Sequence, residues 1–405
     1  MDLRTLYAQR WFAGKGRAVD GVSRIVDVGG LGVVEVRYAD DHGGCERYLI
    51  DDDALRWADL LHALCAGPVT GASGRLELRP GPGLEPLLDP VGGGERLASL
   101  DQSNTLVVVG ERLLVKAYRN LRSGVHPEVE ILAALAGTRA PVPGFGGSVV
   151  LTECDGRETT VALLQRYVPD AASGWEAMIA PVAAQLRGEH ELPAPAFADA
   201  GAASAVLHRV LAERLGAECA PGAGASWHRE AVLVLKAARE LEPSLDTLDT
   251  AEISERLAPL ASADDALVQR IHGDLNLAQF LFAPSGVLII DFEGNPTTPL
   301  ERRRVRDTPL RDVATLLRSI DHVGSAAARR TDGVDPGAWI ECTRAIALQA
   351  YELQAGARAD RALLHALEIV AECRELVYAH RVVPEWAYVA RAGLARLLNA
   401  PALGV

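Results

Sequence analysis

Apolar positions along the 405-residue chain follow two periods, one near two residues and one near 3.6 residues. In the first part of the chain, three apolar runs predict strands, at 23–28, 32–38 and 47–51. The spacing at 53–65 predicts a helix. Residues 79–94 hold so many prolines and glycines that they predict a linker or a long surface loop. A first part that ends near residue 90 is therefore expected.

The following part of the chain, up to residue 168, is again rich in strands. Four apolar and β-branched runs predict strands, at 106–109, 112–118, 148–152 and 160–167. Gly110 and Glu111 join the first two of these runs and predict a hairpin, and a helix is expected at 127–136. From residue 175 onward the helical period prevails, with one strand-like interruption at 267–292. A strand-rich part thus precedes a largely helical one.

The strand-like interruption carries the clearest chemical pattern in the chain. One apolar run ends at His272 and Asp274, Gln279 follows Asp274 by five residues, and a second apolar run ends at Asp291. We expect these side chains on adjacent strand ends. Asp274 could then accept the proton of an attacking hydroxyl, while Gln279 and Asp291 supply oxygen ligands to Mg²⁺ in a phosphoryl transfer. Glu293 is either a second metal-bound carboxylate or a hydrogen-bonded structural acid.

Composition excludes several other classes of protein. Apolar residues make up 49% of the chain and charged residues 23%, which is ordinary for a globular enzyme. No run of 18 apolar residues occurs and no signal peptide is evident, so a cytoplasmic protein without a membrane partner is expected. The six scattered cysteines predict reduced thiols. The net charge of −13 argues against nucleic-acid binding, and a monomer is favoured.

The residues around Asp274 resemble the catalytic and metal-binding loops of aminoglycoside-phosphotransferase-like kinases, which are relatives of protein kinases. Most members have Asn where this chain has Gln279, but the maltokinase branch has Gln. Other segments are similar to that branch and occur in the same order, at 10–17, 102–105, 163–169, 291–296 and 309–314. The resemblance implies an α+β, bilobal protein-kinase-like fold. Its three parts would be an N-terminal cap at 1–90, a nucleotide-binding lobe at 91–168 and a helical lobe at 169–405.

The resemblance also implies that ATP, with Mg²⁺, is the phosphoryl donor. Lys116 would hold the α- and β-phosphates and pair with an acid on the next helix, where the family pattern favours Glu130 over Glu128. The segment that replaces a Gly-rich phosphate loop would use backbone N–H groups and the side chains of Ser103, Asn104 and Thr105. The hinge that meets the adenine would consist of Gln165, Tyr167 and Val168.

Two sugars compete as the acceptor that the resemblance implies: maltose, phosphorylated on its anomeric hydroxyl, and glucosamine, phosphorylated on its 6-hydroxyl. Maltokinases typically have a carboxylate and an arginine where this chain has Ala379 and Val383, which favours glucosamine. Glu368, Glu372 and Glu375 share one helix face, where a cationic amine would relieve their repulsion. A solvated acidic face is the alternative. The expected sugar site comprises Asp274, Glu372, Glu375, Tyr378 and Trp386.

The predicted function is thus the ATP- and Mg²⁺-dependent phosphorylation of D-glucosamine to glucosamine 6-phosphate, with maltose as the alternative acceptor. An aminoglycoside kinase and a nucleotide-binding regulatory pseudokinase are distant alternatives. The N-terminal cap argues against the first, and the second is disfavoured because Lys116, Asp274, Gln279 and Asp291 are all present. Trp175 is expected in the core rather than in a site.

Overall fold

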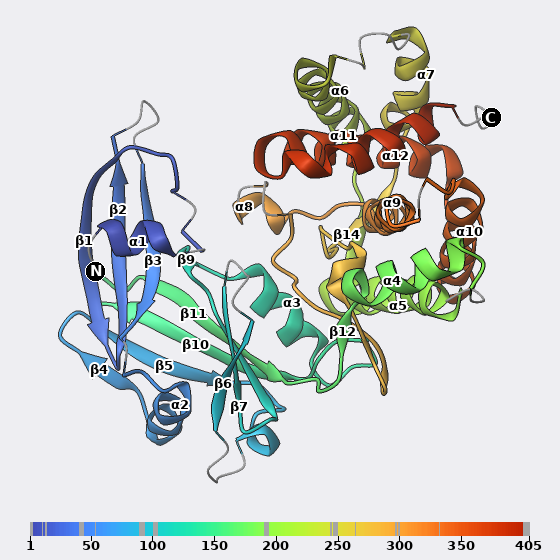
Figure 1. The fold of residues 1–405 in the computed structure, drawn as a ribbon. Coiled ribbons are helices and arrows are strands. Elements are labelled where there is room, and N and C mark those ends of the chain that lie inside the picture. Colours follow the sequence, from blue (N-terminus) through green and yellow to red (C-terminus); the bar gives the residue numbers. More distant parts are fainter. Residues whose placement is uncertain are drawn as a thin grey trace. The chain divides into compact units, whose positions relative to one another are not determined.

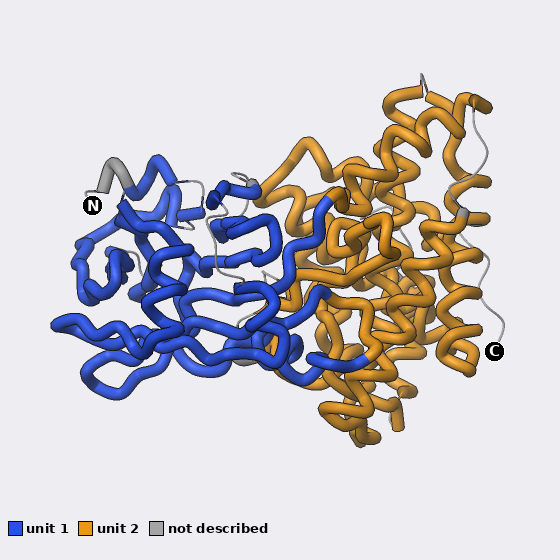
Figure 2. Tube along the Cα trace, turned by 90° about the horizontal axis from the view of Figure 1, so that it is seen from below, with its two compact units in different colours: residues 1–138, 143–169 blue, residues 139–142, 170–405 orange. Residues whose placement is uncertain are grey.

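The structure is a computed structural model. It describes residues 3–9, 11–12, 14–39, 44–52, 54–88, 94–99, 104–189, 194–243, 245, 250–263, 265–295, 298, 300–331 and 333–399. The chain forms two compact units (Figure 2). Unit 1 comprises residues 1–138 and 143–169, and unit 2 comprises residues 139–142 and 170–405.

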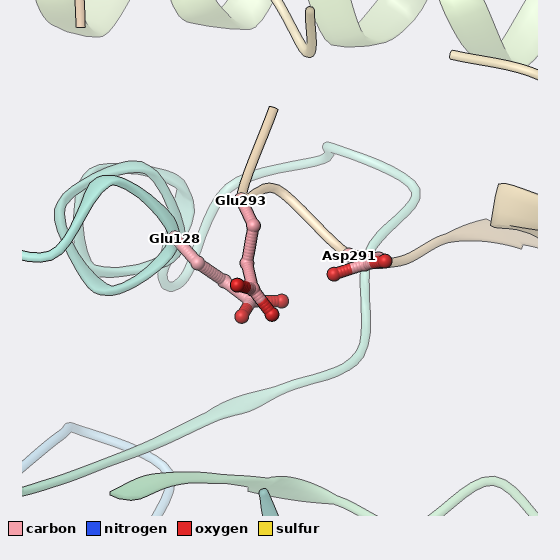
Figure 3. A group of neighbouring side chains, drawn as sticks. All are labelled: Glu128, Asp291 and Glu293. Carbon is pink, nitrogen blue, oxygen red and sulfur yellow. The ribbon is translucent and has the colours of Figure 1, made fainter. Parts of the chain in front are cut away.

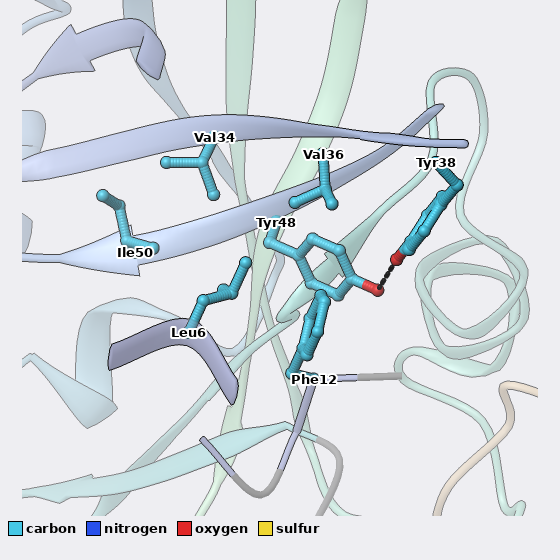
Figure 4. Packing of buried hydrophobic residues seen from close by; sticks show 7 residues of the cluster. All are labelled: Leu6, Phe12, Val34, Val36, Tyr38, Tyr48 and Ile50. Atoms are coloured by element: carbon cyan, nitrogen blue, oxygen red, sulfur yellow. Dashed lines mark hydrogen bonds between the residues drawn. The ribbon is translucent and has the colours of Figure 1, made fainter. Parts of the chain in front are cut away.

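A four-stranded antiparallel sheet forms one part of unit 1. Its strands, in spatial order, are β1 (Val19–Val28), β2 (Leu31–Tyr38), β3 (Cys45–Asp51) and β9 (Asn120–Leu121). Gly29 and Gly30 join β1 to β2 with φ of +60° and +81°, the left-handed conformation that a two-residue hairpin turn requires. Leu6 of α1 (Leu3–Ala8) and Phe12 pack with apolar side chains of β2 and β3 (Figure 4). The three strands expected in this region are confirmed.

A seven-stranded antiparallel sheet forms the rest of unit 1. Its strands, in spatial order, are β4 (Val69–Gly71), β5 (Gly74–Pro80), β10 (Phe145–Glu153), β11 (Glu158–Arg166), β8 (Leu113–Ala117), β7 (Thr105–Val109) and β6 (Glu95–Ser99). The hairpin predicted at Gly110 and Glu111 is confirmed, and both residues have positive φ, at +60° and +54°. The unit also contains α2 (Trp57–Ala66), η1 (Glu85–Leu87) and α3 (Pro127–Leu135).

The boundary expected near residue 90 does not separate two sheets. β5, from the first part of the chain, pairs with β10 along its whole length, from Gly74 opposite Glu153 to Pro80 opposite Gly147. In the other direction, β9 pairs with β3. In both cases a strand from one side of residue 90 pairs with a strand from the other side, and this pairing satisfies backbone N–H and C=O groups that would otherwise be exposed at a sheet edge. The stretch rich in proline and glycine therefore marks a connection within one folded unit.

Unit 2 is mostly helical. Its helices are α4 (Gly174–Leu186), α5 (Ala194–Leu215), α6 (Ala223–Leu241), α7 (Thr250–Ala261), α8 (Leu300–Arg303), α9 (Pro309–Ala328), α10 (Gly337–Ala355), α11 (Arg361–Val382) and α12 (Ala387–Asn399). A single-turn 3-10 helix, η4 (Pro384–Trp386), joins the last two. Figure 1 shows α9 among the other helices, and it packs against α4, α10, α11 and α12. Within the described ranges, no helix is both long enough and apolar enough to span a bilayer.

Two small sheets flank the segment with the expected catalytic residues. β14 (Leu267–Gln269) pairs with β13 (Ala217–Cys219). β16 (Gly286–Ile289) pairs instead with β15 (Phe280–Ala283), which also pairs with β12 (Ala172–Ser173). The two apolar runs therefore pair in different sheets, but their ends lie next to each other, as predicted. Nε2 of His272 lies 2.9 Å from the carbonyl oxygen of Ile290, and its ring lies 4.7 Å from that of Phe292.

Candidate active site

A buried carboxylate on α9 holds the loop that follows β14. His272 and Gly273 each donate a backbone N–H to Asp312, over 2.8 Å to Oδ2 and Oδ1 respectively. Oδ2 of Asp312 also lies 3.0 Å from Nε2 of His208. Burial raises the pKa of Asp312, but its bonds to His208 and to the backbone outweigh this and hold the pKa below its usual range. Asp312 thus fixes the shape of the loop that ends at Asp274.

Asp274, the expected base, has a carboxyl group that protonates unusually easily. Burial raises its pKa to about 7, against the opposing charge of Arg318 and with a further contribution from the charge of Asp291. The loop places Asp274 through two local bonds, from its own N–H to Nδ1 of His272 at 3.3 Å and from the N–H of Asn276 to its carbonyl at 2.8 Å. A carboxyl group that titrates near neutrality is suited to accept a proton during catalysis.

Two carboxylates come together after β16. The N–H of Ile290 donates to the carbonyl of Gln279 at 2.9 Å, which ties this segment to η3 (Leu277–Gln279). Asp291 then adopts a φ of +66°, a strained conformation for a residue with a side chain. Figure 3 shows Asp291 and Glu293 on this segment, and their carboxylate oxygens lie within 4.8 Å of each other. Oxygen ligands at this spacing suit a hard divalent cation such as Mg²⁺.

A pocket of about 440 Å³ within unit 2 is lined by Asp274. Three of the residues expected to bind the sugar also line it: Glu375, Tyr378 and Trp386. Trp175 lines the same pocket, and its ring meets that of Trp386 edge to face, with centroids 5.5 Å apart. The prediction that Trp175 belongs to the core is therefore wrong, because the first turn of α4 faces this pocket. Two indole rings offer apolar surface to a sugar ring.

Arg318 and His322 of α9 line the pocket as well, and the sequence pattern did not single them out. Nη1 of Arg318 donates to Oε2 of Glu375 over 2.6 Å. Nε2 of His322 lies 3.0 Å from Oε2 of Glu372, and burial lowers the pKa of His322 to about 4. His322 is therefore neutral at physiological pH. The available signal was the presence of these polar residues, four positions apart, on a helix that is otherwise largely buried.

Glu372 is not part of the pocket lining, so its assignment to the sugar site is wrong. Its side chain is fully buried beside His322, and burial raises its pKa well above the usual range. Glu368 pairs with Arg344 of α10 over 2.6 Å. The acidic face of α11 is thus divided among protein partners on two neighbouring helices, because residues spaced by four and seven positions point along an arc rather than in one direction. Of the three glutamates, Glu375 lines the pocket.

Lys116 lies on β8 in unit 1 and is 7% exposed. Its Nζ is 2.9 Å from Oε2 of Glu128, which also accepts a hydrogen bond from the hydroxyl of Tyr118 over 2.8 Å. Glu128 lies in the first turn of α3 and is 1% exposed. The structure therefore gives Lys116 the partner Glu128, and the preference for Glu130 is corrected. The family pattern misplaces the acid by two residues, which on a helix turns a side chain well away from the same direction.

The described end of the expected phosphate loop lies next to the Lys116 strand. Asn104 precedes β7, and Thr105, its first residue, is opposite Ala117 of β8. Ser103, also expected to bind phosphate, lies outside the described residues. The assignment of Asn104 and Thr105 to phosphate binding stays a prediction.

The expected hinge follows β11. Gln165 is buried within that strand, and Val168 comes two residues after the strand ends. The N–H of Tyr167 donates to the carbonyl of Arg112 over 2.7 Å, and its hydroxyl accepts a hydrogen bond from Arg96 over 3.0 Å. The amide and the hydroxyl of Tyr167 therefore serve contacts within unit 1. The expected role of the three hinge residues at the adenine stays a prediction.

The sequence of the chain is similar to those of known kinases. No family model matches the chain. Over 332 residues the chain is 32% identical to a glucosamine kinase of Streptacidiphilus jiangxiensis, which covers 75% of this chain and 74% of that protein. Over 335 residues it is 32% identical to a glucosamine kinase of Mycolicibacterium smegmatis (strain ATCC 700084 / mc(2)155), with 76% and 80% covered.

The fold of the chain is also similar to solved structures of glucosamine kinases. A crystal form of a glucosamine kinase matches with a TM-score of 0.69 and 27% identity, covering 98% of each chain. A glucosamine kinase in complex with glucosamine, ADP and inorganic phosphate matches with a TM-score of 0.68 and 27% identity, covering 98% of this chain and 99% of that one. The predicted α+β, kinase-like fold is therefore confirmed.

Proposed function

Because the chain belongs to the glucosamine kinase family, we propose that it transfers the γ-phosphoryl group of ATP to the 6-hydroxyl of D-glucosamine. The observation that carries this proposal is the placement of Asp274 in one pocket with Glu375 and two tryptophans. The products are glucosamine 6-phosphate and ADP. The relatives support glucosamine over maltose, as does the chain's departure from the maltokinase pattern at Ala379 and Val383.

The acceptor hydroxyl is activated by Asp274. As the 6-oxygen forms a bond to the γ-phosphorus, its proton passes to Asp274, and the bond from the γ-phosphorus to the bridging oxygen of ADP breaks. Arg318 lowers the pKa of Asp274 against the effect of burial, which keeps part of the carboxyl groups ionised at neutral pH. Phosphoryl transfer needs little covalent chemistry from the protein, so placing the hydroxyl against this carboxylate is the main task of the pocket.

Recognition of the amino group falls to Glu375. Its carboxylate is bound to Arg318 through Oε2 over 2.6 Å, and it lines the pocket together with Tyr378. A carboxylate held by one arginine bond has further acceptor positions for an ammonium group, and charge-assisted hydrogen bonds are stronger than neutral ones. The indole rings of Trp175 and Trp386 flank the pocket as apolar surface for the pyranose ring.

The nucleotide is bound by residues of unit 1. Lys116, oriented by Glu128, binds the α- and β-phosphates, and Asn104 and Thr105 contact phosphate at the start of β7. Asp291 and Gln279 would supply oxygen ligands to Mg²⁺, and Glu293, whose carboxylate lies close to that of Asp291, would supply a further one. Mg²⁺, when bound, offsets the negative charge of the phosphates.

The proposal is tested by ATP consumption with glucosamine, glucose, N-acetylglucosamine and maltose, using Asp274→Asn as the control. We expect turnover with glucosamine, at least 100-fold less in the variant because general base catalysis contributes about 10²- to 10⁴-fold. Phosphorus–proton NMR of the product locates the phosphate. Turnover of maltose alone, or a product phosphorylated at another carbon, would refute the proposed acceptor or the proposed hydroxyl.

A further inference from the structure

Arg119 lies between β8 and β9 and is 6% exposed. Its guanidinium donates to three groups on two strands of unit 1. Nη2 donates to Oδ2 of Asp51 over 2.5 Å, Nη1 to the carbonyl of Leu49 over 3.2 Å, and Nε to Oγ1 of Thr105 over 2.7 Å. The first two partners belong to β3 and the third is the first residue of β7. One buried cation therefore joins the four-stranded sheet to the end of the expected phosphate loop, where β7 begins.

The N-terminal segment covers the same cation. The guanidinium carbon of Arg119 lies 5.6 Å from the centroid of the Trp11 ring, which in turn lies 5.7 Å from the ring of Tyr48. The segment is held close to the sheet, since a Cβ atom at Gly14 would overlap the hydroxyl of Tyr38. Trp11 and Gly14 belong to the motif at 10–17 for which the phosphoryl transfer itself gives no role.

The contacts of Arg119 also determine which hydrogen-bonding groups the loop presents. A hydroxyl has one hydrogen to donate and two lone pairs to accept with. Because Thr105 accepts the Nε–H of Arg119, its own O–H is directed elsewhere. The backbone N–H of Arg119 donates to Oδ1 of Asn104 over 3.3 Å, which orients that side chain too. Both groups are thereby set as donors, the kind of group that a phosphate oxygen requires.

We infer that Arg119 is a positioning residue through which β3 and the Trp11 segment set the donors of Asn104 and Thr105 for the phosphates of the nucleotide. The inference rests on the proposed function, since it assumes that these two residues bind ATP. Asp51 is the remote member of the arrangement. Its carboxylate compensates the buried charge of Arg119 and fixes the plane of the guanidinium, so that Nε meets Thr105.

The first experiment replaces Asp51 with Asn and measures ADP binding by calorimetry and the KM values for ATP and glucosamine. We expect the Kd for ADP and the KM for ATP to rise about tenfold, the lower end of the effect of a lost charge-assisted hydrogen bond. The KM for glucosamine and kcat should stay within about twofold. Glu153→Gln is the matched control. Arg47, also on β3, donates to Oε2 of Glu153 over 2.6 Å in a similarly buried pair that does not involve Asn104 or Thr105.

A double-mutant cycle separates positioning from loss of stability. If Asp51 acts through Arg119 on Thr105, Asp51→Asn should have little effect on the Kd for ADP once Thr105 is replaced by Val. Arg119→Lys keeps the charge but not the planar fork, so it should also raise that Kd about tenfold with little change in Tm.

Two results would overturn the inference: independent effects of Asp51→Asn and Thr105→Val on ADP binding, or a Glu153→Gln variant that weakens ADP binding as much as Asp51→Asn does. A failure of the proposed function would look different. In that case the unaltered protein itself would neither bind ADP nor consume ATP with glucosamine.

Discussion

Replacing Arg318 with Met tests whether this arginine sets the pH at which the enzyme works. Asp274 must be ionised to accept a proton, so kcat should rise with pH through its pKa, which is about 7. Arg318 is the largest influence that lowers this pKa. Opposite charges within about 4–6 Å shift a carboxyl pKa by roughly 1–3 units, so its removal should raise the pKa by about one unit or more. Loss of the Arg318 bond to Glu375 acts in the same direction, because it leaves a negative charge uncompensated.

The magnitude follows from the ionised fraction. With a pKa of about 7, about half of the Asp274 carboxyls are ionised at pH 7. An upward shift of about one unit leaves about a tenth ionised, so kcat at pH 7 should fall about fivefold and recover at higher pH. The assay measures kcat at saturating glucosamine from pH 5.5 to 9 for the unaltered enzyme, Arg318→Met and Arg318→Lys. Titration of the substrate amine affects all three alike.

Arg318→Lys keeps the charge, so its profile should remain close to that of the unaltered enzyme. A uniform loss of kcat in Arg318→Met with an unchanged midpoint would show that the arginine acts through the shape of the pocket alone. A midpoint that moves to lower pH would refute the electrostatic reasoning altogether.

Three further predictions follow from the same contacts. The raised pKa of Asp274 means that its ionisation destabilises the fold, so stability is lost as pH rises from about 4 to about 7. Asp274→Asn should therefore raise the free energy of unfolding, measured by urea denaturation, by a gain that grows between about pH 4 and 7 to at most about 4 kcal/mol and then levels off; a gain independent of pH would contradict this. Glu375→Gln should reduce the preference for glucosamine over glucose about tenfold, because Glu375 lines the pocket. Glu372→Gln should leave this preference unchanged, because Glu372 is fully buried beside His322 and does not line the pocket; kcat/KM for the two sugars is the measurement, and an equal loss in both variants would contradict the assignment. Glu128→Gln should raise the KM for ATP about tenfold, because it removes the charged partner of Lys116, whereas Glu130→Gln should change this KM less than about twofold. Equal effects of the two variants on the KM for ATP would favour Glu130 as a partner of Lys116 after all.

The strands of unit 1 could be predicted because their signals are local. Two glycines between β1 and β2, and Gly110 with Glu111 between β7 and β8, meet the backbone requirement of two-residue turns within a few residues of sequence. The partner of β5 could not be predicted in this way. It pairs with β10, about 70 residues later in the chain, and the sequence of neither strand identifies the other as its partner.

The candidate site shows the same division. Asp274, Gln279 and Asp291 lie within one short segment, and their spacing was enough to suggest phosphoryl transfer. The acidic face of α11 was visible as well, but its partners were not. Whether Glu372 faces a ligand or a neighbouring helix depends on the position of His322, 50 residues away in the sequence. Spacing on one helix therefore indicates which residues lie close together, and tertiary packing decides what they face.

The buried polar residues of α9 explain why this helix organises the site of unit 2. Asp312 holds the loop before Asp274, and seven residues later Ser319 accepts the backbone N–H of Leu277 over 3.0 Å, which holds the loop after it. Two helical turns thus place both groups on one face, toward the catalytic segment. Arg318 lies next to Ser319 and is turned toward the pocket and α11. The polar residues of α9 can be recognised in the sequence, because they interrupt a largely apolar helix. Because a buried polar group costs free energy unless it is paired, such positions are where a search for the partners of a catalytic loop should begin.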